Sequence, residues 1–183
     1  MIINEKEITK ISKLLSLVLR HRPESIKIEL DENGWTDVSE LLEKMNEHNQ
    51  PISLDILKLV VETNAKKRFA FNDNYSKIRA NQGHSVDVEL GYTPQSPPEI
   101  LYHGTGEKSV ASIWATGIKK RDRHHVHLSA DFETAIKVGQ RHGNPFVFEV
   151  LAGEMNKNNF PFYKSDNGVW LTDFVPFEYL RKK

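Results

Sequence analysis

Cysteine is absent from this chain of 183 residues, which excludes disulfide bonds and thiolate metal sites. Apolar runs of membrane length are absent too. The first residues, MIINEKEITK, lack the basic segment and apolar core that mark a secretory signal, so no such signal is expected. These absences predict a cytoplasmic protein that is neither disulfide-stapled nor embedded in a membrane.

Net charge is also missing, because 25 lysines and arginines balance 25 aspartates and glutamates. Neither half of the chain is strongly basic, which argues against non-specific binding of nucleic acid through a broad positive surface. Any recognition of phosphate must then depend on a few well-placed cations. The position of each arginine is therefore more informative than the total.

Helical periodicity begins near the N-terminus. Apolar residues recur at spacings of three and four from Glu5 to Leu19, which predicts an amphipathic helix that Pro23 ends. Residues 26–30, IKIEL, alternate in the manner of a short strand. The following segment, TDVSELLEKM, predicts a second helix, with Thr36 or Asp37 as its N-cap.

A third helix is expected to begin at Ser53, and the alternating segment KRFAFNDNYSKIRA predicts a β-hairpin with its turn at residues 72–74. Helix, strand, helix, helix, hairpin is the order of elements in a winged-helix module. Such modules bind nucleic acid or other proteins, so the order by itself does not define a function.

A domain boundary is predicted at residues 91–99, GYTPQSPPE, where three prolines and a glycine occur among few apolar residues. The expected organisation is a first domain at 1–90, this linker, and a second domain at 100–183. The second domain contains short strands and two short helices, one ending near Gly117 and one running from Asp131 to about Arg141. The predicted fold class is α+β.

Two cationic segments could contact phosphate. LVLRHRPESI places Arg20 and His21 at the end of the first helix, where they could merely complement the helix dipole or could form a phosphate clamp. AKKRFAF places Lys66, Lys67 and Arg68 at the start of the hairpin, and such a run is either a solvated edge or a second set of phosphate ligands.

Two segments of the second half resemble ligand sites. LYHGTG, residues 101–106, is a strand followed by a helix, and its glycines could let a ligand approach the backbone or could simply form a turn. RDRHHVHLS is rich in histidine, but the chain has no cysteine and no HExxH helix, so no metal is expected. Arg121 and Arg123 in this segment suit an anion better.

Taken in order, LRHRP, KKRF, IRANQGHS, YHGT, RHHVHLS and NGVWLTD resemble the NAD-dependent RNA 2′-phosphotransferases. The resemblance extends from about residue 8 to residue 180. It implies an N-terminal winged-helix lobe that binds the RNA phosphate and a C-terminal lobe of the ADP-ribosyltransferase fold that binds NAD. In this family the active site lies in the cleft between the lobes, which needs no second copy of the chain, so a monomer is expected.

The implied reaction removes an internal 2′-phosphate from RNA and transfers it to NAD, used as a co-substrate without a metal. The 2′-phosphate first attacks C1″ of the nicotinamide ribose, and nicotinamide leaves. The ribose O2″ then attacks the phosphorus, releasing RNA with a 2′-OH and ADP-ribose 1″,2″-cyclic phosphate. In eukaryotes the family acts in tRNA splicing, on a 2′-phosphate at the splice junction.

The resemblance also implies roles for individual residues. The family's catalytic phosphate-binding tetrad, Arg-His-Arg-Arg, matches Arg20, His21, Arg68 and Arg123. His21 is the candidate for proton transfer in the second step, and Lys66 matches a family lysine that supports that step.

For NAD, the match implies that His103 and Gly104 contact the ribose and the nicotinamide amide, with Thr105 nearby and His127 as a further contact. Val169 stands where many relatives of this fold have a catalytic glutamate, which argues against ADP-ribosylation of proteins.

Two alternatives remain open from the sequence. One is an ADP-ribosyltransferase that caps phosphorylated nucleic-acid ends and stops after the first step. The other is a winged-helix binder of nucleic acid with a degenerate NAD lobe. Release of a cyclic phosphate separates the phosphotransferase from the capping enzyme.

Overall fold

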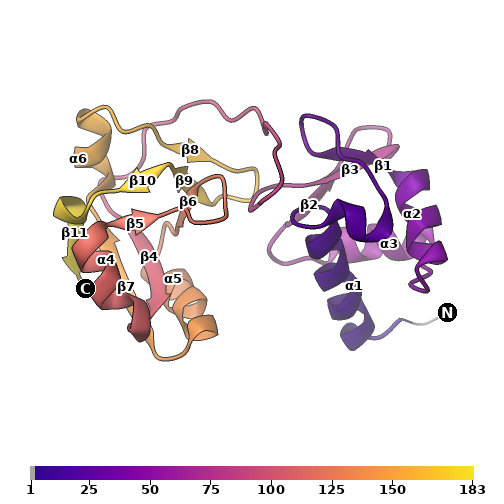
Figure 1. Ribbon diagram of the computed structural model, residues 1–183, viewed down its shortest axis with the longest axis horizontal. Coiled ribbons are helices and arrows are strands. Elements are labelled where there is room, and N and C mark those ends of the chain that lie inside the picture. Colours follow the sequence, from indigo (N-terminus) through magenta and orange to yellow (C-terminus); the bar gives the residue numbers. More distant parts are fainter. Residues whose placement is uncertain (1–2) are drawn as a thin grey trace. The chain divides into compact units, whose positions relative to one another are not determined.

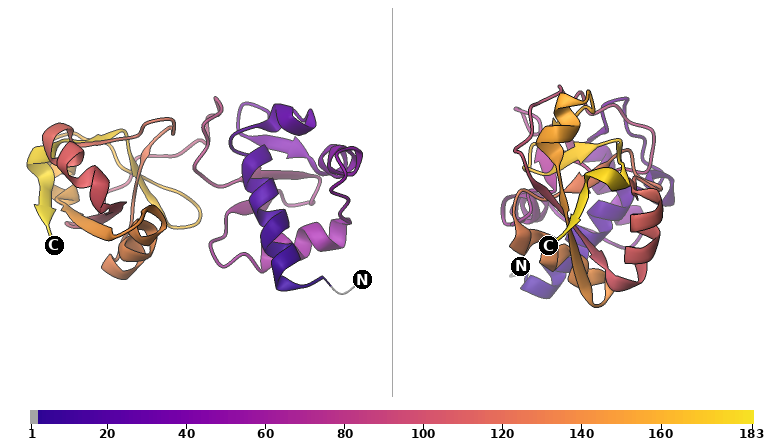
Figure 2. Two further views of the ribbon diagram at one scale, coloured as in Figure 1. Left: turned by 60° about the horizontal axis from the view of Figure 1, so that its bottom comes forward. Right: turned by 90° about the vertical axis from the view of Figure 1, so that its left-hand side faces the viewer.

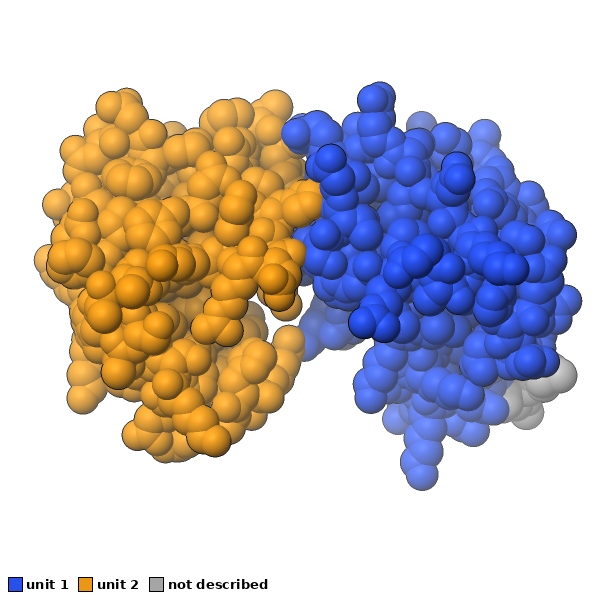
Figure 3. Space-filling model, viewed as in Figure 1, with its two compact units in different colours: residues 1–91 blue, residues 92–183 orange. Residues whose placement is uncertain are grey.

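The computed structural model describes residues 3–183. The chain forms two compact units, unit 1 at residues 1–91 and unit 2 at residues 92–183, which are blue and orange in Figure 3. Both combine helices with small antiparallel sheets. Each unit has its own hydrophobic core, so each is described by itself.

Unit 1 begins with helices and ends with a hairpin (Figure 1). Its elements in chain order are α1 (Glu5–Val18), the 3-10 helix η1 (Pro23–Ile26), β1 (Trp35–Asp37), α2 (Val38–Glu47), α3 (Leu54–Glu62), β2 (Phe69–Phe71) and β3 (Lys77–Ala80). The three strands form one antiparallel sheet in the order β1-β3-β2.

Helix α1 has a capping box at its start, in which the Asn4 and Glu7 side chains each accept a hydrogen bond from the other residue's backbone N–H. The predicted helix is confirmed, with Leu19 as its C-cap. The helix ends at Val18, five residues before Pro23. Residues 20–22, the RHR segment, therefore lie beyond the helix and not in its last turn.

The predicted strand at residues 26–30 is wrong. Pro23 begins the 3-10 helix η1, and Lys27 follows with a φ of 59°, a left-handed conformation that interrupts an extended chain. Ile26 and Ile28 are both buried, so the alternation in the sequence marks burial in the core and not a strand. The strand of this region is β1, which pairs with β3.

The predicted cap of α2 and the predicted start of α3 are confirmed. Of the two candidates for α2, Asp37 is the cap, and its carboxylate accepts hydrogen bonds from the backbone N–H groups of Ser39 and Glu40. Ser53 caps α3 by accepting from the Ile56 N–H. These caps satisfy N–H groups that would otherwise lack partners at the helix starts.

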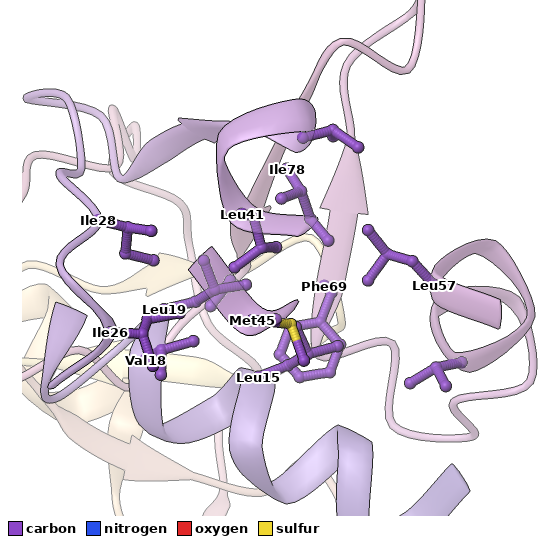
Figure 4. Packing of buried hydrophobic residues seen from close by; sticks show 13 residues of the cluster. Leu15, Val18, Leu19, Ile26, Ile28, Leu41, Met45, Leu57, Phe69 and Ile78 are labelled. Carbon is purple, nitrogen blue, oxygen red and sulfur yellow. The ribbon is translucent and has the colours of Figure 1, made fainter. Parts of the chain in front are cut away.

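The core of unit 1 lies between its helices and its hairpin (Figure 4). Helices α1 and α3 pack side by side (Figure 2). Fully buried side chains come from all of these elements and include Leu15, Leu41, Met45, Leu57 and Ile78. The fold therefore fixes both ends of the RHR segment, because α1 precedes it and η1 follows it.

Unit 2 contains short helices between short strands (Figure 1). Its elements in chain order are β4 (Leu101–Gly106), η2 (Glu107–Ser109), α4 (Val110–Thr116), β5 (Ile118–Lys119), β6 (Val126–Leu128), α5 (Phe132–Gly139), η3 (Gln140–His142), β7 (Pro145–Val150), α6 (Ala152–Lys157), β8 (Tyr163–Lys164), β9 (Trp170–Thr172), β10 (Phe174–Val175), η4 (Phe177–Tyr179) and β11 (Leu180–Lys182).

The strands of unit 2 form three small antiparallel sheets, in the orders β11-β7-β4, β6-β9-β8 and β10-β5. Strand β4 pairs with β7 along its whole length, and helix α5 packs against both strands. An isolated bridge between Tyr102 and Ser129 links β4 to the segment just after β6. The LYHGTG and HVHLS segments are therefore neighbours.

The sequence predicted two helices in this half, but α6 is a third. It begins directly after β7, and its residue Gly153 donates a backbone hydrogen bond to the Glu99 carbonyl. Within residues 3–183, no helix combines the length and the apolar character needed to cross a membrane.

The Asp37 cap provides a test of the fold of unit 1. The side-chain hydrogen bond from Ser39, followed by the Glu40 N–H, holds the pKa of Asp37 below its usual value. A lowered carboxyl pKa stabilises the fold above the unfolded-state pKa, and that stability is lost as pH falls through the folded-state pKa. We expect Asp37→Ala to lower the free energy of unfolding at pH 7 by about 1 kcal/mol.

Urea unfolding of Asp37→Ala at a series of pH values measures this effect, and the deficit should shrink below about pH 4, where the wild-type carboxyl becomes protonated. Asp37→Asn is the control, because an amide caps the helix without titrating. An Asp37→Ala deficit that stayed constant down to pH 2 would contradict a charged cap.

Candidate functional site

In unit 1 the Arg20 side chain contacts the backbone carbonyl oxygen of Arg68. Arg20 Nη2 donates to this oxygen at 3.4 Å, and the Asn81 backbone N–H donates to it at 2.8 Å. The Arg20 guanidinium also lies over the Phe69 ring, 5.9 Å from its centroid. The Arg20 side chain, from the segment after α1, thus reaches the backbone of Arg68, just before β2.

His21 is exposed, and its ring is oriented by a serine from the segment after the hairpin. Its Nδ1 lies 2.9 Å from Ser85 Oγ. The Ser85 backbone N–H donates at 2.9 Å to the Arg20 carbonyl, which fixes that serine against the end of α1. The segment IRANQGHS therefore supports the RHR segment and is more than a polar turn.

Two asparagines hold the turn that carries Lys66 and Arg68. Lys67, which lies between Lys66 and Arg68, has a left-handed φ of 41°. Its N–H donates to the Asn64 carbonyl and its own carbonyl accepts from Asn81 Nδ2, both at 2.7 Å. These asparagines were not assigned a role from the sequence, although Asn81 lies within IRANQGHS.

A carbonyl oxygen and an aromatic ring both contact the Arg20 guanidinium and help to orient it. The same unit holds His21 and Arg68 within one hydrogen-bonded network. Guanidinium groups match the oxygens of a phosphate, and charge-assisted hydrogen bonds of this kind are the stronger ones. This cluster, Arg20–His21–Arg68, is suited to a phosphate.

In unit 2 a second cluster joins His103, Arg123 and His127. His103 Nδ1 lies 3.2 Å from the backbone carbonyl oxygen of His127, and Arg123 Nη1 lies 3.1 Å from His127 Nδ1. His103 comes from β4 and His127 from β6, whereas Arg123 lies in the turn before β6. Three of the sequence-predicted residues are therefore in direct contact here.

Burial lowers the pKa of His103 below its ordinary value. Its hydrogen bond to the His127 carbonyl opposes this shift, and nearby positive groups, Arg121 first, add to it. His103 is therefore a neutral imidazole at neutral pH. Partial removal from water and then the charge of Arg141 lower the pKa of Arg123, but a guanidinium stays protonated at neutral pH.

Gly104 and Thr105 lie on β4 beneath helix α5, and both are buried. A Cβ at Gly104 would collide with the Ala135 carbonyl group and approach the Gly139 backbone N to 3.0 Å. Gly139 in turn lies against the Thr105 backbone. The glycine of YHGT is thus required for close packing of a helix on this strand, whatever ligand contact it makes.

Val169, at the position where a catalytic glutamate occurs in other proteins of the expected fold, is half-buried just before β9. Its backbone N–H and carbonyl both bond to Ser165, which closes a tight turn. Glu149 on β7 forms an ion pair of 3.0 Å with Lys183. Its carboxylate is therefore engaged by the C-terminal segment.

The histidine-rich segment shows no metal-binding arrangement. Among residues 3–183, no three or more histidine, aspartate or glutamate side chains are grouped so as to hold a metal ion. His125 precedes strand β6, and its ring packs edge-on against Tyr163, with 5.5 Å between the ring centroids.

Comparison with known proteins shows the family to which the chain belongs. A family model described as RNA 2′-phosphotransferase, Tpt1 / KptA family, matches residues 6–174, and the chain belongs to this family. Two curated relatives, each named probable RNA 2′-phosphotransferase, illustrate the similarity. The protein from Trichormus variabilis is 56% identical over 171 residues, 93% of this chain and 94% of the relative. The protein from Flavobacterium johnsoniae is 53% identical over 180 residues, 98% and 99% of the two chains.

Packing at Gly104 gives a prediction that does not depend on any ligand. We expect Gly104→Ala to lower the free energy of unfolding by about 3 kcal/mol, because the new methyl group forces helix α5 away from β4. Urea unfolding followed by circular dichroism measures the loss. Gly168→Ala is the control, since its φ is 81° but no atom lies within 4 Å of the added Cβ, and about 1 kcal/mol is expected there. Equal losses in the two variants would refute the packing role.

Proposed function

We propose that this chain is an NAD-dependent RNA 2′-phosphotransferase, in which unit 1 is a winged-helix lobe and unit 2 is an ADP-ribosyltransferase-like lobe. The observation that carries the proposal is the family match over residues 6–174, which spans both the Arg20–His21–Arg68 cluster and the His103–Arg123–His127 cluster. The order of elements in unit 1, with its three-stranded sheet, supports a winged helix.

In the first proposed step, an oxygen of the RNA 2′-phosphate attacks C1″ of the nicotinamide ribose, and the bond from C1″ to nicotinamide breaks. The attacking phosphate is already an anion, so this step needs no general base. Arg20 and Arg68 hold that phosphate, and the family resemblance assigns Arg123 to the same tetrad. Fixed donors of this kind lose little orientational freedom when they bind.

In the second proposed step, the ribose O2″ attacks the phosphorus and the bond from phosphorus to the RNA O2′ breaks. One proton leaves O2″ and one joins the RNA oxygen. His21 is the group proposed to move the proton, since an imidazole titrates near neutral pH. Its contact with Ser85 keeps the ring in a defined orientation. The arginines stabilise the charge that develops on the phosphate oxygens.

NAD is proposed to bind at the cluster in unit 2. A neutral His103 keeps one ring nitrogen as a hydrogen-bond acceptor, which fits a ribose hydroxyl. Thr105 lies two residues beyond His103 on the same strand. The half-buried Val169 supplies no carboxylate to align a protein acceptor, which favours a substrate that is itself an anionic nucleophile.

The products test this function. The protein is incubated with NAD and a short RNA that carries one internal 2′-phosphate, and every product is identified by mass. RNA with a free 2′-OH, nicotinamide and ADP-ribose 1″,2″-cyclic phosphate are expected. RNA that remains ADP-ribosylated would favour the end-capping activity, and unchanged RNA would contradict the proposal.

Arg68→Ala tests the phosphate cluster, because it removes the guanidinium and keeps the carbonyl that Arg20 contacts. We expect turnover to fall at least about 100-fold, as for loss of a transition-state donor. Lys77→Ala removes a positive charge from the same unit, in an exposed ion pair with Asp31, and should change turnover less than about threefold. Comparable losses in both variants would point to overall charge and not to the cluster.

A further inference from the structure

The contact between Arg123 and His127 determines which nitrogen of that histidine carries the hydrogen. Arg123 Nη1 lies 3.1 Å from His127 Nδ1. A guanidinium has N–H donors and no acceptor, so Nδ1 must accept the hydrogen bond. His127 is then a neutral imidazole with its hydrogen on Nε2. That nitrogen is a hydrogen-bond donor.

The neighbouring histidine has the opposite arrangement. His103 Nδ1 lies 3.2 Å from the His127 backbone carbonyl, and a carbonyl oxygen only accepts, so His103 Nδ1 carries the hydrogen. In the neutral ring Nε2 is then an acceptor. Burial, which lowers the pKa of His103, keeps this ring neutral.

The two histidines therefore form a complementary pair, one with an accepting Nε2 and the other with a donating Nε2–H. They lie on β4 and β6, which are neighbours in unit 2. A vicinal diol suits such a pair, because one hydroxyl can donate to His103 while the other accepts from His127. The ribose rings of a dinucleotide carry this group.

We propose that Arg123 is a positioning residue for NAD, acting through His127, in addition to its role toward the phosphate. By donating to Nδ1 it keeps His127 as a donor at Nε2. Its remaining N–H groups stay available to an anion. This inference rests on the proposed NAD-dependent function. It gives Arg123 a role toward NAD that is not proposed for Arg20 or Arg68.

The first readout is the state of the two rings, which needs no ligand. Long-range ¹H–¹⁵N spectra of the full chain at pH 8 distinguish the tautomers, with the signals assigned by His103→Gln and His127→Gln. The wild type should show His127 with its hydrogen on Nε2 and His103 with its hydrogen on Nδ1. Arg123→Met should convert His127 to a mixture of tautomers, whereas Arg123→Lys, which still donates, should retain more of the Nε2–H form.

The control is Arg141→Met, which removes a neighbouring positive charge of unit 2 without removing the donor to His127. His127 should keep its wild-type tautomer in that variant. If His127 were as mixed between its two tautomers in Arg141→Met as in Arg123→Met, positive charge alone would determine the tautomer. That result would overturn the inference. So would an unchanged His127 in Arg123→Met.

The second readout is NAD affinity, measured by calorimetry without RNA. We expect Arg123→Met to weaken NAD binding about tenfold, Arg123→Lys to restore part of the loss, and Arg141→Met to stay within about twofold of wild type. If the wild type binds NAD and Arg123→Met binds it equally well, the positioning role is refuted while the proposed function stands. If the wild type does not bind NAD, the proposed function fails and the ligand assignment fails with it.

Discussion

The carbonyl oxygen of Arg68 is the atom on which the Arg20–His21–Arg68 cluster of unit 1 depends. It accepts from the Arg20 side chain and from the Asn81 N–H, so the end of α1, the start of β2 and the segment after β3 converge there. Positive groups repel one another, so bringing them together requires contacts that fix their geometry. A carbonyl oxygen, the Phe69 ring and Ser85 provide contacts of this kind.

In unit 2 uncharged groups also orient a cationic side chain, but the groups are different. The neutral imidazole of His127 orients Arg123, and the backbone carbonyl of His127 orients the ring of His103. Helix α5 packs against β4, the strand that carries His103. This close contact is possible because Gly104 has no side chain. The proposed result is a donor–acceptor pair of histidines next to a cation. Preorganisation of this kind would favour the proposed transfer of a phosphate to NAD.

Local patterns predicted the helices well, because caps such as Asp37 and Ser53 act within one turn of the chain. The strand expected at residues 26–30 failed because burial, which alternates there, does not require a pairing partner. The site residues could be named by resemblance, but their supports could not be deduced. Asn81 and Ser85 act on residues far away in the sequence, and such contacts leave no local periodicity.

The central claim is that unit 1 binds the phosphate and unit 2 binds NAD. The most direct test is a ¹⁵N spectrum of the full chain titrated with NAD alone. The account predicts that the largest shift changes fall on β4 and β6, around His103 and His127. Changes centred on Arg20, His21 and Ser85, with β4 and β6 unaffected, would contradict it.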